Sequence, residues 1–202
     1  TSDIIAKQNS NDALTGDFIT SEKPVYFDVK VAEGRYKVTV TLGDPKGTSG
    51  TTVKAESRRL MLENIQTKRG EVVEKTFLLD VRSPQINATE SIKRKPREMT
   101  YNNWDNKLNL EFNGKNPCVS SVTIKETKDI PVIFLAGNST VTDQEYEPWA
   151  SWGQMFPRFL KPEIVVANFA ESGETLLGFK AENRLKKILS EMNPGDYLFI
   201  EF

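Results

Sequence analysis

The stretch that most constrains this chain is an uninterrupted apolar run at residues 130–136, which stops at Gly137. An apolar run bounded by a glycine turn is typical of a parallel strand that is buried on both faces. Open α/β sheets carry their chemistry just beyond the carboxyl end of such a strand. Ser139 stands at that position, and we expect the second part of the fold to present it.

The pattern before residue 125 is different, because short segments there alternate between apolar and polar residues. Residues 25–31 and 35–42 show this period of two, which predicts an antiparallel hairpin with one buried face. Short strands at regular spacing, without a helical pattern between them, predict an all-β sandwich or jelly roll over residues 1–125. The further strands expected in this part are residues 51–55, 59–65, 71–81, 107–112 and 119–124.

Residues 126–202 read as a second domain, which follows a charged linker at residues 125–129. The order strand, helix, strand, helix, strand predicts a parallel sheet. Residues 177–192 read as one amphipathic helix, with Lys and Arg opposite its apolar face. Its apolar positions are Leu185, Ile188, Leu189 and Met192. The expected strands are residues 130–136, 164–167 and 196–202, and the first helix is expected at residues 152–160.

The composition excludes several kinds of site. The chain has no histidine, so a Ser-His pair or a His-based zinc site cannot be assembled from these residues. Cys118 is the single cysteine, and we expect neither a metal nor a cofactor. The net charge of −1 gives no reason to expect nucleic acid as a partner, and the short basic runs at residues 58–59 and 93–95 read as surface or salt-bridge residues. No apolar stretch approaches the roughly 18–20 residues that a membrane span needs.

A serine becomes a nucleophile when a base takes its proton and an oxyanion hole receives the developing charge. The backbone N–H of Ser139 is one candidate donor to that hole. A second candidate is Gly173, in the loop at residues 168–175, which should follow the next parallel strand and reach the same crevice. On spacing alone, the alternative is that residues 137–140 form only a strand-to-helix turn.

Two blocks in this region resemble the SGNH (GDSL) hydrolases, most closely the branch of rhamnogalacturonan acetylesterases. Residues 135–143, LAGNSTVTD, are similar to the first block, and residues 167–175, ANFAESGET, are similar to the second. Residues 147–154, EPWASWGQ, resemble the segment between them, and residues 194–197, PGDY, resemble the start of the strand that leads to the third block. Residues 1–125 look like the jelly-roll module that some bacterial members carry.

The resemblance implies a flavodoxin-like, three-layer α/β domain, of which residues 126–202 would be the first half. It implies O-deacetylation of an acetylated plant polysaccharide or oligosaccharide, such as rhamnogalacturonan pectin or xylan, with Ser139 as nucleophile. Ser139 N–H and Gly173 N–H would form the oxyanion hole. It also implies a secreted or periplasmic bacterial enzyme, although the sequence given shows no signal peptide.

The sequence departs from the family in two respects. Asn138 replaces the aspartate of the first block, and an amide can keep the turn's hydrogen bonds but not the charge. The third block, Gly-x-Asn-Asp, and the late Asp-x-x-His that supplies the base are absent. Because residues 196–202 end in an apolar strand without edge protection, we expect the natural protein to continue past Phe202. These 202 residues alone should hydrolyse esters poorly or not at all.

Other side chains are candidates for binding. Asn138, Thr140 and Asn168 are candidates for lining the substrate site, and so are Trp149 and Trp152, whose alternative role is packing. Residues 143–147 contain three acids, which read as Ca²⁺ ligands or, better, as solvated side chains. A carbohydrate platform could use Tyr101 and Trp104, although Trp104 fits core packing equally well. The rival function is a non-catalytic carbohydrate-binding or interaction module. A structural module that orients the second domain is a third possibility.

Overall fold

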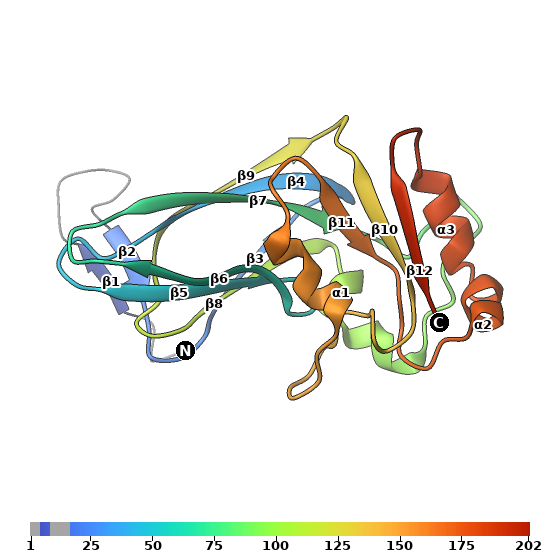
Figure 1. The fold of residues 1–202 in the computed structure, drawn as a ribbon, viewed down its shortest axis with the longest axis horizontal. Coiled ribbons are helices and arrows are strands. Elements are labelled where there is room, and N and C mark those ends of the chain that lie inside the picture. Colours follow the sequence, from blue (N-terminus) through green and yellow to red (C-terminus); the bar gives the residue numbers. More distant parts are fainter. Residues whose placement is uncertain (1–4, 9–16) are drawn as a thin grey trace.

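The computed structural model describes residues 5–8 and 17–202 (Figure 1). The polar start at residues 1–20, which the sequence predicts as a loose segment with one edge strand, contains strands at Ile5–Gln8 and Asp17–Thr20, and its other residues lie outside this description. Most of the regular secondary structure in the described residues is strand, with few helices. The strands of the first part are β1 Ile5–Gln8, β2 Asp17–Thr20, β3 Val25–Lys30, β4 Gly34–Leu42, β5 Ser49–Ala55, β6 Arg59–Thr67, β7 Val73–Val81, β8 Lys107–Asn113 and β9 Cys118–Thr127.

These strands form two facing antiparallel sheets, with the orders β1-β2-β9-β4-β7 and β3-β8-β5-β6. Strand β4 shows why the sandwich forms, because Val38, Val40 and Leu42 are completely buried at every second position. Val53 of β5 and Leu108 of β8 meet them from the other sheet in one continuous core. A strand face this apolar is stable only when another sheet covers it.

The predicted hairpin of residues 25–31 and 35–42 is wrong. Strand β3 pairs with β8, whereas β4 pairs with β7 and β9, so the two strands lie in opposite sheets. Three residues, 31–33, connect them. Stacked sheets are about 10 Å apart, and three extended residues can span that distance. The alternating pattern predicts which faces are buried, but it does not say whether two such faces are side by side or opposed.

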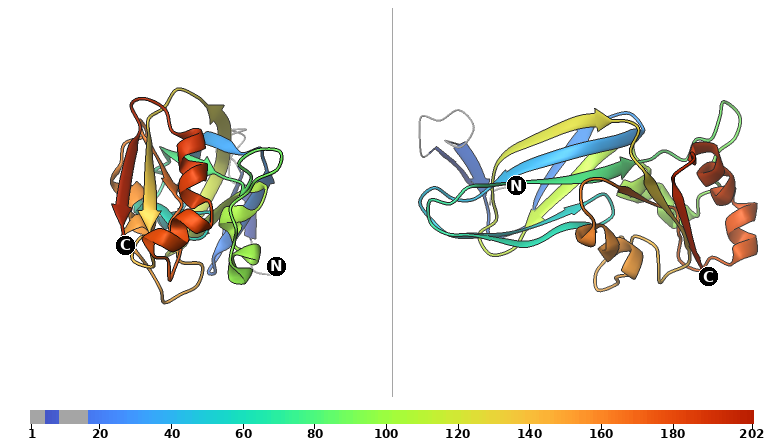
Figure 2. Two further views of the ribbon diagram at one scale, coloured as in Figure 1. Left: turned by 90° about the vertical axis from the view of Figure 1, so that its right-hand side faces the viewer. Right: turned by 45° about the horizontal axis from the view of Figure 1, so that its top comes forward.

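The second part contains a parallel sheet with β10, Val132–Gly137, in the centre. Strands β11, Val165–Asn168, and β12, Tyr197–Glu201, pair with β10 on either side in parallel register. The parallel pairing agrees with the prediction, which did not specify the central strand. Helices cover both faces of the sheet, with α2 and α3 on one side and α1 on the other (Figure 2). The bounds are α1 Trp152–Met155, η3 Phe156–Phe159, α2 Leu176–Ala181 and α3 Arg184–Glu191.

The single amphipathic helix predicted at residues 177–192 is instead two helices. The chain breaks at Asn183, whose φ of 64° lies in the left-handed region, and its side-chain amide donates to the carbonyl of Ser91 at 3.1 Å. The expected polar face is also wrong, because Arg184 and Lys187 are buried while Leu189 is 60% exposed. Both cations form ion pairs with carboxylates of the first part, which compensates for their burial.

The two parts are joined by more than the expected linker. Strand β9 continues to Thr127, so the first residues of the predicted linker belong to the sandwich. Leu78 points out of the five-stranded sheet and packs with Phe134 and Phe169 of the second part. Ile92 and Trp104, from the connection between β7 and β8, complete that cluster. This connection includes two short turns, η1 Pro96–Thr100 and η2 Asn102–Trp104. The parallel sheet is therefore built directly against the sandwich.

Candidate functional site

Ser139 lies in a tight turn just beyond β10 and is exposed. Gly137 permits this turn, because a Cβ there would lie 2.4 Å from the carbonyl oxygen of Glu201. The carbonyl of Asn138 accepts hydrogen bonds from the N–H groups of Val141, at 3.1 Å, and Thr142, at 3.0 Å. Its side-chain oxygen accepts a hydrogen bond from the N–H of Thr140 at 3.1 Å. Asn138 thus keeps the turn's hydrogen bonds, as an amide can.

The nucleophile candidate has two unpaired groups. Among the described residues, neither the hydroxyl nor the backbone N–H of Ser139 has a hydrogen-bond partner. In a trans peptide the N–H points away from the carbonyl of the preceding residue. Since the carbonyl of Asn138 is held inside the turn by two N–H groups, the N–H of Ser139 is directed to the opposite side. The carbonyl of Ser139 is fixed separately by the side-chain amide of Gln144, at 2.8 Å.

The loop after β11 begins beside this turn. Its first residues are hydrogen-bonded to β10, with Phe169 N–H to the Leu135 carbonyl at 2.9 Å and Glu171 N–H to the Gly137 carbonyl at 3.1 Å. Gly173 follows in the left-handed region, with a φ of 75°, and it is exposed. The structure gives its N–H no hydrogen-bond partner in the described part of the chain. Both expected oxyanion donors are therefore unpaired N–H groups on adjoining loops.

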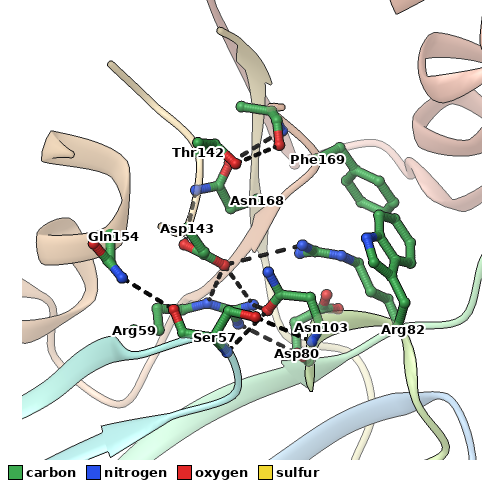
Figure 3. A network of polar contacts seen from close by, with 12 residues as sticks. Ser57, Arg59, Asp80, Arg82, Asn103, Thr142, Asp143, Gln154, Asn168 and Phe169 are labelled. Carbon is green, nitrogen blue, oxygen red and sulfur yellow. Dashed lines mark hydrogen bonds and ion pairs between the residues drawn. The ribbon is translucent and has the colours of Figure 1, made fainter. Parts of the chain in front are cut away.

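A buried polar network surrounds Asp143, which follows the Ser139 turn in the sequence (Figure 3). At its centre, Asp143 accepts hydrogen bonds from Arg59 Nε at 3.0 Å and from Asn168 Nδ2 at 2.9 Å. The guanidinium of Arg82 lies 4.0 Å from the same carboxylate and 4.7 Å from the centre of the Trp104 ring. Burial lowers the pKa of Arg59, but the carboxylates of Asp143, Glu56 and Asp80 together outweigh that effect and raise it. The network ties the Ser139 loop to strands β6 and β7.

Sequence reasoning missed this network. The sequence predicts Arg59 as a surface or salt-bridge residue, and the salt bridge is present, but it is buried. For Asp143 the prediction of a solvated acid or a Ca²⁺ ligand is wrong, because its carboxylate is the buried partner of Arg59. The available signal lay in β7, where Asp80 interrupts a segment that is apolar on both faces. Such a segment indicates a strand covered on both sides, and a charge inside it needs a buried partner.

Glu145 and Glu147, the other two acids of the proposed Ca²⁺ set, are also bound to protein groups. Glu145 accepts a hydrogen bond from the Ser57 hydroxyl, and Glu147 pairs with Arg58 at 3.3 Å. Glu147 is nevertheless 73% exposed, which agrees with the prediction of a solvated acid. Burial raises the pKa of Glu145. In the described residues no cluster of acids or cysteines is arranged to hold a metal ion, and no helix there has the length and apolar character needed to cross a membrane.

Of the candidate substrate-lining residues, Thr140, Trp149 and Trp152 are exposed, whereas Asn168 is buried. Thr140 and Trp152 meet at Glu201, which accepts from the Thr140 hydroxyl at 2.6 Å and from Trp152 Nε1 at 3.0 Å. Trp149 is 67% exposed, so it is not a packing residue. Asn168 contradicts the expectation that it lines the site, because it is fully buried. Its side-chain amide is hydrogen-bonded within the protein, because Nδ2 donates both to the Val141 carbonyl and to Asp143.

The expected carbohydrate platform is not formed as a pair. Trp104 is 7% exposed, and its indole N–H donates to Glu98 at 3.1 Å, so it is a core residue and offers no platform. Tyr101 is half-buried and meets Tyr146 edge-on, with their ring centres 6.3 Å apart. Tyr146 itself is largely exposed.

Comparison with known proteins gives relatives that are named as esterases. No family model matches the chain. It is 30% identical over 185 residues to the uncharacterized esterase YxiM of Bacillus subtilis (strain 168), an alignment that covers 87% of this chain and 41% of that protein. It is 40% identical over 72 residues to the rhamnogalacturonan acetylesterase RhgT of the same organism, covering 35% of this chain and 31% of that protein. The chain spans well under half the length of these curated relatives.

Among solved structures, the crystal structure of YxiM is similar to 98% of this chain, at 26% identity and a TM-score of 0.47, over 53% of that chain. The structure of a carbohydrate-binding module, CBM35 from Paenibacillus barcinonensis, covers 62% of this chain at 12% identity and a TM-score of 0.39.

Proposed function

We propose that this chain is part of a carbohydrate O-acetyl esterase that acts by acyl transfer to Ser139. The observation that carries the proposal is the pairing of an unbonded serine hydroxyl with two unbonded N–H groups, those of Ser139 and Gly173, at the ends of adjacent parallel strands. Proteins named as rhamnogalacturonan acetylesterases align with about a third of the chain, which supports this class of substrate.

The chemistry proceeds in two balanced steps. The Ser139 oxygen attacks the acetyl carbonyl carbon while a base takes the hydroxyl proton, and the N–H groups of Ser139 and Gly173 bind the oxyanion. The intermediate collapses, the bond to the sugar oxygen breaks, and that oxygen receives the proton. Water then attacks the acetyl-serine in the same manner, which releases acetate and restores the hydroxyl. We assign the SGNH type to this mechanism.

The resemblance implies a histidine as the base, and the sequence contains none. We propose that a histidine outside residues 1–202 supplies it, and that the 202-residue chain alone turns esters over poorly. Acetylated rhamnogalacturonan and acetylated xylan are the two candidate substrates, and both place the protein outside the cytoplasm. Peptide mass sequencing of the native protein beyond Phe202 would show whether Gly-x-Asn-Asp and Asp-x-x-His follow.

The test on the 202-residue chain supplies the missing base as free imidazole. With p-nitrophenyl acetate, we expect slow nitrophenol release that rises with imidazole concentration beyond the reaction of imidazole alone. The Ser139→Ala variant should show no such excess at any imidazole concentration, since imidazole then has no hydroxyl to activate. Equal rates for the two proteins would contradict acyl transfer at Ser139.

One observation favours a second candidate, a non-catalytic carbohydrate-binding module. Tyr146 and Trp149 expose 63% and 67% of their surface on one loop, and exposed aromatic rings provide faces for stacking. If the native protein binds rhamnogalacturonan or xylan oligosaccharides, and Trp149→Ala weakens binding while Ser139→Ala leaves native acetyl release unchanged, this second function replaces the first.

A further inference from the structure

The connection between β7 and β8 places two cations on one carbonyl group of the Gly173 loop. The carbonyl oxygen of Ser172 accepts a hydrogen bond from Lys95 Nζ at 2.9 Å and another from the Arg97 guanidinium at 2.5 Å. Hydrogen bonds with a charged donor are roughly twice as strong as neutral ones. Neither cation belongs to the parallel sheet, since both lie in the segment that enters and forms η1.

The held carbonyl shares a peptide plane with the Gly173 N–H. In a trans peptide the two groups point in opposite directions, so fixing the Ser172 carbonyl fixes the direction of the Gly173 N–H. Hydrogen bonds to the carbonyl also polarise the peptide group, which makes its N–H a stronger donor. Gly173 needs such support, because a glycine in an exposed loop has more conformational freedom than any other residue. The Asn138–Ser139 peptide has the same arrangement, held there by Val141 and Thr142.

The cations themselves are fixed by acids of the same loop. Arg97 Nε donates to Glu171 at 2.8 Å, and Lys95 pairs with Glu174. Both acids are nearly inaccessible, with side-chain exposures of 5% and 2%. Each cation therefore contacts one of the two carboxylates and the Ser172 carbonyl that lies between them in the sequence. Together these contacts hold the loop at residues 171–174.

The turn that carries the cations, η1, is held in place by the buried side chain of Glu98. Glu98, in η1, accepts hydrogen bonds from the Lys95 N–H at 2.8 Å and from Trp104 Nε1 at 3.1 Å. It also forms an ion pair with Arg184 at 2.5 Å, and both side chains of that pair are almost completely buried. Groups held by such a layer of partners keep their geometry better than groups on free loops.

We propose that Lys95 and Arg97 are positioning residues for the oxyanion hole, which orient the Gly173 N–H through the Ser172 carbonyl. This inference rests on the proposed acyl transfer at Ser139. A direct role in binding an anionic polysaccharide is the alternative, but Glu171 and Glu174 already neutralise the two cations. The connection that interrupts the sandwich thereby becomes part of the esterase site.

The kinetic test uses the native protein and acetylated rhamnogalacturonan. Complete loss of one oxyanion donor costs about 10²–10³ in kcat. We expect the double variant Lys95→Met, Arg97→Met to lose about 10-fold to 100-fold in kcat with KM unchanged, and the charge-preserving pair Lys95→Arg, Arg97→Lys to recover most of it. Lys93→Met is the matched control, because Lys93 lies in the same segment and is exposed, and it should keep wild-type kcat.

A change confined to KM would overturn the proposal in favour of direct substrate binding, and a wild-type kcat in the double variant would overturn it as well. A native protein that is no more active than its Ser139→Ala variant would instead refute the proposed esterase. Independently of turnover, the order parameter of the Gly173 amide in the ¹⁵N-labelled 202-residue chain tests whether the two cations hold this N–H in place. We expect a rigid value near 0.85 in the wild type and a value below about 0.6 in the double variant, and equal values would overturn the positioning role.

Discussion

The buried carboxyl group of Glu56 makes the stability of this protein depend on pH. It lies between β5 and β6, is 6% exposed, and accepts a hydrogen bond from the Asn109 N–H at 3.2 Å. Burial raises its pKa from 4.5 to about 8, although nearby Arg59 acts in the opposite direction. A raised pKa means that the folded protein holds the proton more tightly than the unfolded chain does. The stability contributed by protonated Glu56 is therefore full below pH 4.5 and is lost as the pH rises through 8.

We predict that Glu56→Gln flattens this loss. Glutamine keeps the accepting oxygen and never ionises, so the free energy of unfolding should fall less between pH 5 and pH 9 than it does in the wild type. At about 1.4 kcal/mol per pKa unit, the difference between the two proteins at pH 9 should reach several kcal/mol. Urea denaturation at the two pH values measures it. Glu22→Gln removes a charge from an exposed position and should follow the wild type, whereas parallel wild-type and Glu56→Gln profiles would contradict the assignment.

At the scale of elements, the break between α2 and α3 depends on Asn183. Asparagine tolerates the left-handed region, and here it also holds the Ser91 carbonyl, which lies on the connection from the sandwich. Asn183→Ala should destabilise the protein by about 1–2 kcal/mol for the backbone conformation alone. Asn183→Gly loses the same hydrogen bond but relieves that strain, so its urea midpoint should lie clearly above that of the alanine variant. An alanine variant as stable as the glycine one would mean that the break is not required.

The elements themselves were largely predictable from the sequence. The apolar run ending at Gly137 predicted β10, and alternation predicted the buried face of β4. Pairing was not predictable between β3 and β4, because one apolar face suits either a neighbouring or an opposing strand. The predicted side-chain roles were wrong where polar residues are buried, as with Asn168 and Arg184. These residue types are normally exposed, and only their tertiary partners explain the burial.

At the scale of the whole molecule, the sandwich and the parallel sheet share one apolar cluster, in which Leu78 and Trp104 meet Phe134. Removing either part would expose this cluster to water, at roughly 25 cal/mol per Å² of apolar surface. We predict one cooperative unfolding transition. Far-UV circular dichroism includes the signal of the sandwich strands, whereas tryptophan fluorescence reports the contact between the parts through Trp104 and the second part through Trp149 and Trp152. The two thermal midpoints should coincide.

Leu78→Ala tests the same coupling. Truncating a buried leucine typically costs about 2–5 kcal/mol, and because this residue belongs to both parts it should lower both midpoints equally. Fluorescence that changes at a lower temperature than the circular dichroism, in either protein, would show that the two parts unfold separately.

The connection between β7 and β8 has a consequence for anyone who wishes to exchange modules. A cut at the charged segment near residue 128 looks like a clean joint in the sequence, yet it leaves Lys95, Arg97 and Glu98 with the donor scaffold. The recipient would contain Ser139 but would lack the cations that we propose to orient the Gly173 N–H. On the proposed acyl transfer at Ser139, a graft of this activity must therefore carry the connection between β7 and β8 as well, so the boundary of the proposed site does not coincide with the charged segment.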